Sequence, residues 1–245
     1  MQEIISPEGL RIDGRRANEL RRIRCQMGVL ANADGSSYYE QGNTKVICAV
    51  YGPREVNVKN TSRFDRAIIN CEYFMARFST NEHRKRSKGD RRSTEISLII
   101  KQTFEAAILT YLYPNRQIDI FVQVVQADGG TRCAGINAAT LALIDAGIPI
   151  SDFVVACAAG CHEETPILDL NYFEDSSSSP DVPVAIFPKS GKVIVVQMDS
   201  KLPLSTFEKV MDTAIDGCYK IYAIMTEIVM QYNLDLLDSR GCFIK

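Results

Sequence analysis

The sequence predicts an α+β fold of two layers, in which helices pack against β-sheets. Short apolar runs of strand length and three segments of helical period follow one another in the order strands, helix, strand, helix, strands, helix. With 245 residues, of which 46% are hydrophobic, the chain is long enough to bury a large core. No Pro/Ser/Gly-rich linker divides it, so we expect one domain over residues 1–245.

The strand predictions depend on short apolar runs bounded by turn residues. Residues 45–51 and 67–73 form two such runs, with turn signals at Asp34-Gly35 and Gly52-Pro53, and we expect them to be strands of a meander. Residues 117–126 place isoleucine and valine on one face, which is typical of a strand. Three further strands are predicted at 153–159, 182–188 and 193–198.

Three helices are predicted, the first from apolar residues that recur at three- and four-residue spacing and the other two from residues typical of helix ends. The first begins near Ser93 and ends before Pro114, and the second covers residues 134–146 with Gly147 as its cap. A capping box at residues 205–208 predicts the start of the last helix. Its inward face is expected to comprise Phe207, Val210, Met211, Ala214, Cys218, Ile221 and Met225.

The basic residues are unevenly distributed, although the net charge is only −2. Six arginines lie between residues 11 and 24, and six basic residues lie between 84 and 92. A single basic run is most simply a solvated surface. Two runs in the same half of a chain that is acidic overall indicate a polyanionic partner. The run at 84–88 also leaves a nuclear import signal open.

The chain lacks the marks of a membrane or secreted protein. No apolar run approaches the roughly 20 residues that cross a bilayer, and the N-terminus lacks a signal-peptide pattern. None of the eight cysteines is at CxxC spacing, so we expect free thiols in a reducing compartment. Cys157, Cys161 and His162 lack the second pair of ligands that a structural zinc site requires.

The junction between the strand at 117–126 and the next helix, Asp128-Gly129-Gly130-Thr131-Arg132, predicts an anion site. Glycines let backbone approach a ligand, a helix N-terminus attracts negative charge, and the Arg132 guanidinium fits a phosphate oxygen pair. A tight turn with a surface arginine is equally consistent with these residues alone. The spacing matches neither the P-loop nor the dinucleotide-binding pattern.

A second pair of arginines, Arg91 and Arg92, lies just before the first predicted helix. Cations at a helix N-terminus oppose the helix dipole, so their placement calls for an anion or an acid nearby. Both helix starts are therefore candidates to converge on one anion. The alternative is an ordinary charged helix end.

Four acids lie between residues 169 and 181, and two of them, Asp175 and Asp181, flank a polar loop predicted between two apolar strands. Each alone is most simply a turn former. Together they are candidates to bind a divalent metal or to share a proton transfer. Neither histidine lies in a metal-ligand pattern, and no Gly-x-Ser-x-Gly segment is present.

Several motifs resemble the RNase PH family over nearly the whole chain, from about Ser6 to the last helix. Residues 9–16, Gly-Leu-Arg-Ile-Asp-Gly-Arg-Arg, resemble the start of its chains. Segments similar to its exosome branch are 33–38, 41–46, 51–55, 126–132, 137–140 and 145–149.

The resemblance implies a fold related to ribosomal protein S5 domain 2 and 3′→5′ phosphorolysis of RNA, with inorganic phosphate as co-substrate. By motif, the implied phosphate-binding residues are Arg92, Gly130, Thr131 and Arg132. Asp175 and Asp181 match the carboxylate pair of the family. One of the two would protonate the leaving 3′ oxygen, directly or through a divalent ion such as Mg²⁺. The implied RNA-binding residues are Arg66, Arg91, Arg84 and Arg86.

The implied partners are a single-stranded RNA 3′ end, related subunits in a hexameric ring, and S1/KH cap subunits, located in nucleus, nucleolus and cytoplasm. Two functions stay open. The chain is either a phosphorolytic exoribonuclease when paired with a related subunit, or a non-catalytic ring subunit that threads RNA to a separate hydrolytic nuclease. The exosome-like segments argue against a third, a free-standing tRNA-trimming homo-hexamer. We expect Arg92, Arg132, Asp175 and Asp181 in one cleft.

Overall fold

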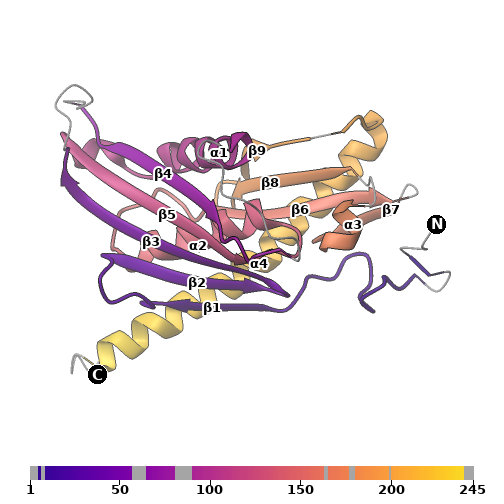
Figure 1. Cartoon of the computed structure of the whole chain (residues 1–245), viewed down its shortest axis with the longest axis horizontal. Coiled ribbons are helices and arrows are strands. Elements are labelled where there is room, and N and C mark those ends of the chain that lie inside the picture. The colour runs from indigo at the N-terminus through magenta and orange to yellow at the C-terminus, as the bar shows by residue number, and fades with distance from the viewer. Residues whose placement is uncertain are drawn as a thin grey trace.

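The computed structural model describes residues 5–6, 9–56, 65–80, 90–162, 165–176, 180–198 and 200–239. Two sheets and their helices make up the fold (Figure 1). The first sheet contains β1 (Ile23–Met27), β2 (Gly35–Gln41), β3 (Thr44–Glu55), β4 (Ile68–Met75) and β5 (Arg116–Gln126), in the order β1-β2-β3-β5-β4. The second contains β6 (Val155–His162), β7 (Thr165–Leu168), β8 (Asp181–Phe187) and β9 (Lys192–Val196), in the order β7-β6-β8-β9.

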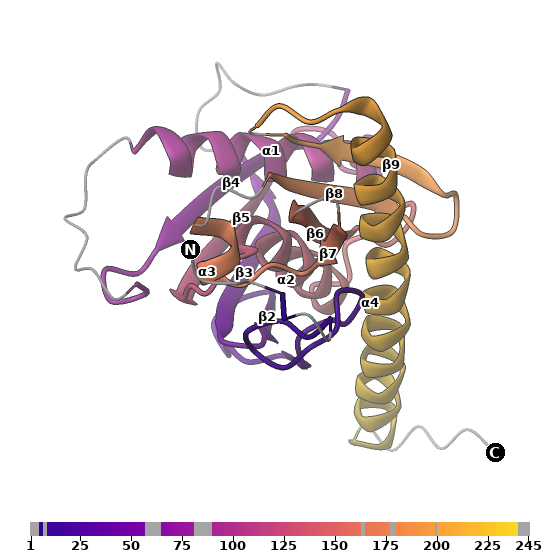
Figure 2. The same ribbon diagram turned by 90° about the vertical axis from the view of Figure 1, so that its right-hand side faces the viewer.

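The helices are α1 (Arg91–Ala107), α2 (Thr131–Asp145), α3 (Tyr172–Ser176), α4 (Leu204–Ser239) and the 3-10 turn η2 (Thr110–Leu112). Both α1 and α2 contact each sheet, whereas α4 packs along the second sheet and reaches β1 (Figure 2). The α+β class expected from the sequence is confirmed. None of the described helices combines the length and the apolar character that a membrane span needs.

β1, β2 and β3 pair antiparallel in sequence order, and the strand predicted at 45–51 lies in this meander as part of β3. The strand predicted at 67–73 lies mostly in β4, outside the meander, so the meander prediction is wrong for that strand. β5 lies between β3 and β4, pairing antiparallel with the former and parallel with the latter. A parallel pair needs a long crossover connection, and α1 supplies it. The crossover places the start of α1 close to the start of α2, which follows β5.

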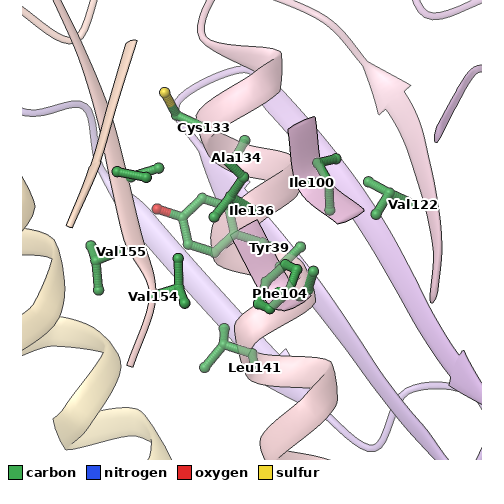
Figure 3. Close-up of a cluster of buried hydrophobic side chains, with 14 of the residues drawn as sticks. Tyr39, Ile100, Phe104, Val122, Cys133, Ala134, Ile136, Leu141, Val154 and Val155 are labelled. Carbon is green, nitrogen blue, oxygen red and sulfur yellow. The ribbon is translucent and has the colours of Figure 1, made fainter. Parts of the chain in front are cut away.

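The core is centred on α2, whose residues from Cys133 to Leu143 are all buried. A helix that is buried all round lies between other layers rather than on a surface. Here β2 and β3 cover one side and β6 the other. Figure 3 shows Ile136 and Leu141 of α2 among Tyr39 and Val155 from the two sheets. The first turn of α2 is thereby fixed by the best-packed part of the molecule.

Several element boundaries differ from the sequence prediction. The capping box at 205–208 is wrong, because α4 begins at Leu204 and the Pro203 carbonyl accepts hydrogen bonds from the Thr206 and Phe207 amides. β2 was not predicted because most of its buried side chains are polar, namely Ser36, Ser37 and Gln41. Ser37, for example, donates a hydrogen bond of 2.6 Å to the Ala138 carbonyl of α2. β7 and α3 have only four and five residues, too few to show a period.

The seven cysteines within the described ranges are free thiols. Burial raises the pKa of Cys25, Cys71 and Cys218 to about 12 in each case, so these thiols stay protonated at neutral pH. Among the described residues, no group of three or more His, Cys, Asp or Glu side chains is arranged to hold a metal.

Candidate active site between two helix starts

A pocket of about 110 Å³ lies where the starts of α1, α2 and β8 meet the short helix α3. The structure brings to it all six residues that the sequence predicted for phosphate binding and acid–base chemistry. These are Arg92, Gly130, Thr131, Arg132, Asp175 and Asp181. Met75, Ala127, Cys133, Tyr172 and Pro183 are among the other residues that line it.

Arg92 and Arg132 occupy equivalent positions, each being the second residue of its helix. The sequence placed Arg91 and Arg92 just before the helix, and this is wrong by two residues. Neither helix start has a side-chain hydrogen-bond cap from the described part of the chain, and neither has an acid in its first turn. Amide donors, the positive ends of two helix dipoles and two guanidinium groups therefore act on one pocket.

The Gly129-Gly130 turn requires glycine for a reason that the sequence did not reveal. Both residues have positive φ, 77° and 63°. A Cβ at Gly129 would lie 2.5 Å from the Leu170 carbonyl oxygen, which belongs to the segment leading into α3. The turn is thus packed backbone to backbone against the acid-bearing segment. The tight turn and the ligand approach, set as alternatives above, are compatible here.

The guanidinium of Arg132 is oriented by the second sheet. Its Nη1 donates a hydrogen bond of 3.0 Å to Oε1 of Gln197, which follows β9. The backbone N–H of Gln197 in turn donates to the Pro183 carbonyl at 3.2 Å, and Pro183 lines the pocket. Sequence reasoning missed Gln197, because it lay within the strand predicted at 193–198.

The two carboxylates reach the pocket from different elements. Asp181 is the half-buried first residue of β8. Asp175 is exposed and lies on α3, so the prediction that it begins a loop between two strands is wrong. A capping box fixes α3: the Asn171 amide donates to Glu174 at 2.9 Å, and the Glu174 amide donates to Asn171 Oδ1 at 3.0 Å.

Cys133 also lines the pocket, next to Arg132. Burial raises the pKa of its thiol well above the usual value, and the charge of Asp181 raises it further. A thiol in this state is a poor nucleophile. The pocket therefore offers anion-binding groups and carboxylates, with no activated side-chain nucleophile among its described lining residues.

Comparison with known proteins assigns this arrangement to a family. Residues 19–149 match domain 1 of the 3′ exoribonuclease family, the RNase PH model, and residues 152–217 match its domain 2. The chain belongs to the RNase PH family. The resemblance and the RNase PH fold expected from the sequence are both confirmed.

The relatives of this RNase PH-family chain include exosome subunits from eukaryotes and archaea. An Arabidopsis thaliana exosome complex component RRP41 homolog is 57% identical over 97% of this chain and 98% of its own length. Exosome complex component Rrp41 of Methanopyrus kandleri is 49% identical over 90% and 92%. The crystal structure of rice Rrp46 has a TM-score of 0.79 at 25% identity, over 89% of this chain and 100% of that one.

The similarity to an archaeal structure supports the fold and nothing further, because the sequence identity is low. An Archaeoglobus fulgidus exosome with RNA bound to the active site has a TM-score of 0.77 at 20% identity, over 88% of this chain and 92% of that chain. The two matched segments of the present RNase PH-family chain share one hydrophobic core, to which α2 and β6 both contribute. One domain over residues 1–245 stays a prediction.

Half of the N-terminal basic run of this RNase PH-family chain is structural, because three of its six arginines make internal ion pairs. Arg11 is buried against Glu174, and Arg21 is buried against Asp169. Burial alone would raise the pKa of Asp169, but the charge of Arg21 and its hydrogen bonds lower it below the usual value. Arg15 pairs with Asp13 at the surface end of the same run. The remaining arginines of the run, Arg16, Arg22 and Arg24, are exposed.

Two of the residues predicted to bind RNA, Arg66 and Arg91, lie outside the pocket lining. Arg66 is exposed before β4, and its Nε donates to Asp65 at 2.9 Å. Arg91 is exposed at the start of α1, beside Arg92. Arg84 and Arg86 lie outside the described residues, so their contribution stays a prediction.

Proposed function

We propose that the chain is an Rrp41-type subunit of an exosome ring, in which it shortens RNA from the 3′ end with inorganic phosphate as co-substrate. The observation that carries the proposal is the convergence of two arginines from two helix starts with two carboxylates around one pocket. The family of 3′ exoribonucleases and relatives named exosome complex component Rrp41, archaeal ones included, support the same reading.

In the proposed reaction, phosphate lies at the first turn of α2, held by the Gly130 and Thr131 backbone and by Arg132. Arg92 neutralises the phosphodiester from the start of α1. A phosphate oxygen attacks the terminal phosphorus, a new P–O bond forms, and the bond to the 3′ oxygen of the preceding nucleotide breaks. The product is a nucleoside diphosphate. Positioning and charge neutralisation suffice for such a transfer, so no protein nucleophile is needed.

The leaving 3′ oxygen needs a proton, and the carboxylate pair is its proposed source. Asp175 on α3 and Asp181 on β8 both line the pocket together with Arg92 and Arg132. The pair also fits Mg²⁺, which is commonly held by one or two carboxylates together with waters and substrate oxygens. Such an ion, when bound, would neutralise charge on the oxygens of the reacting phosphate. Asp175 and Asp181 would be its protein ligands.

The partners in this proposal are a single-stranded RNA 3′ end, related RNase PH-like subunits in a hexameric ring, and S1/KH cap subunits, with a location in nucleus, nucleolus and cytoplasm. Arg92 and Asp175 are exposed at the edge of the pocket, where a neighbouring subunit and the RNA can reach them. Arg66, Arg91, Arg84 and Arg86 are proposed to hold the RNA backbone upstream of the reacting end.

The test uses the assembled ring with 5′-labelled single-stranded RNA, with and without phosphate. We expect nucleoside diphosphates that appear only with phosphate and that are lost in Arg132→Ala and in Asp175→Ala. Arg24→Ala, an exposed arginine of β1 away from the pocket lining, serves as the matched control. A ring that binds RNA but releases no diphosphate would make the chain a threading subunit. Monophosphates formed regardless of phosphate would reject the proposal.

A further inference from the structure

Arg11 makes an unusually complete set of contacts although it does not line the pocket. Its side chain is fully buried. Nε donates to Glu174 Oε1 at 2.7 Å, and Nη2 donates to Glu174 Oε2, so the ion pair is bidentate. Nη1 donates to the Leu168 carbonyl at 2.6 Å and Nη2 to the Asp169 carbonyl at 3.0 Å. One guanidinium thus fixes the segment from the end of β7 to α3.

Glu174 passes this restraint to the neighbouring Asp175. It forms the capping box with Asn171 while it accepts from Arg11. An isolated helix of five residues is far below the roughly 12 residues needed for marginal stability in water. The position of α3 is therefore determined by its contacts, and the strongest of those is the buried pair with Arg11.

A second buried arginine connects the same segment to the Gly129-Gly130 turn. Arg21 Nη2 donates to Asp169 Oδ1 at 2.7 Å, and its Nη1 donates to the Asp128 carbonyl. Asp128 Oδ1 in turn accepts from the Tyr172 amide at 3.2 Å, at the first residue of α3. The Gly129-Gly130 turn and α3 are consequently held against each other from both sides.

We propose that Arg11 is a positioning residue for the carboxylate of Asp175. Through Glu174 it holds α3 at a fixed distance from the Gly129-Gly130 turn, so that the Asp175 side chain faces the anion bound by Arg132. This inference rests on the proposed phosphorolysis and names a residue that supports the proton-transfer step without touching substrate. Arg21 acts on the same segment from the side of the turn.

The experiment measures phosphorolysis by the assembled ring, with kcat and the KM for phosphate determined separately. Arg11→Met alone leaves the buried Glu174 carboxylate without its partner, so the principal variant is Arg11→Met with Glu174→Gln. Glutamine is neutral and can still accept in the capping box. We expect kcat to fall at least tenfold while the KM for phosphate stays within twofold. Arg11→Lys, which keeps the charge but not the fork, should recover part of the loss.

Two controls separate positioning from general destabilisation. Tyr232→Phe removes a partly buried hydrogen bond of 2.7 Å to Asp145. Asp145 is the last residue of α2, about 21 Å along the helix from its first residue. It should leave kcat within twofold. In an Asp175→Asn background, the Arg11 variants should cost less than a further twofold in kcat, because both changes remove the same function.

The outcomes distinguish this inference from the function on which it rests. An active wild-type ring whose Arg11→Met/Glu174→Gln variant also stays within twofold in kcat overturns the positioning role alone. A full additional loss in the Asp175→Asn background overturns it as well. A wild-type ring without phosphate-dependent release overturns the proposed function, and the inference with it. If the double variant does not assemble, Arg11→Lys decides: unchanged kcat rejects the role, and a reduced kcat with unchanged KM supports it.

Discussion

Nη1 of Arg132 lies 3.0 Å from Oε1 of Gln197, and this bond joins the first turn of α2 to the end of β9. Arg132, the arginine proposed to bind phosphate, is therefore oriented by a residue from the other matched segment of the family. A long side chain that is held in place loses less conformational freedom when it binds an anion.

Replacing Gln197 by leucine should weaken phosphate binding. Arg132 would lose its hydrogen bond to Gln197, while leucine retains most of the side-chain volume at position 197. A hydrogen bond to a charged group in a half-buried position contributes about 1 kcal/mol, so the KM for phosphate should rise roughly fivefold. Gln231→Leu, which removes a hydrogen bond to Asp235 on the exposed face of α4, is the control. Equal KM values for the two variants would remove the orienting role.

Arg92 should matter as much as Arg132, because the two arginines occupy the same position in their helices. Arg92→Ala is expected to lower kcat/KM by about 10²- to 10³-fold, the typical cost of losing one preorganised donor to a developing charge. Lysine at 92 should recover only part, since a point charge replaces a planar fork. The measurement is diphosphate release under single-turnover conditions. An Arg92→Ala ring of normal rate would place the reacting phosphate elsewhere.

Gly129→Ala should destabilise the protein more than Gly147→Ala does. Both positions have positive φ, which costs alanine about 1 kcal/mol. A Cβ at 129 would also meet the Leu170 and Asn171 backbone, whereas nothing lies within 4 Å of one at 147. We expect about 3 kcal/mol or more at 129 and about 1 kcal/mol at 147 in urea unfolding. Similar losses would show that the turn adapts to a side chain.

Acid should weaken the fold through Asp169. Its pKa in the folded state is below the ordinary 3.8, so the pair with Arg21 is fully formed above about pH 4 and is lost as the pH falls through the folded pKa. The free energy of unfolding should therefore decrease as the pH falls through that window. Asp169→Asn should be less stable at pH 7 and show a shallower acid dependence. Asp212→Asn, on the exposed face of α4, should keep the wild-type slope.

The candidate site was predictable because its signals are local in sequence. Gly130 to Arg132 at one helix start and Arg92 at another are short patterns whose chemistry follows from the backbone they begin. The class of fold was predictable for a similar reason, since β5 and α1 carry clear periods over 11 or more residues and Gly147 marks the end of α2. The exact helix starts were not, because no side-chain cap marks them.

What the sequence did not reveal depends on pairs that are distant in the chain. Arg11 and Glu174 are 163 positions apart, so the basic run indicated a polyanionic partner, and the internal ion pairs that half of it makes were not predicted. Likewise Ser36 and Ser37 gave no strand signal, because their burial depends on partners in α2. α3 is too short for any period, and it exists through contacts that only the folded chain supplies.

The burial of α2 on every side has a consequence for how this family can change. Eleven consecutive residues from Cys133 to Leu143 are buried between two sheets, so the backbone amides at the start of α2 keep their place whether or not a ligand is bound. A descendant in which Arg92 or Asp175 at the edge of the pocket is substituted would lose the proposed activity and retain the fold. Inactive subunits can therefore arise by few substitutions while their shape, and with it a place in a larger assembly, persists.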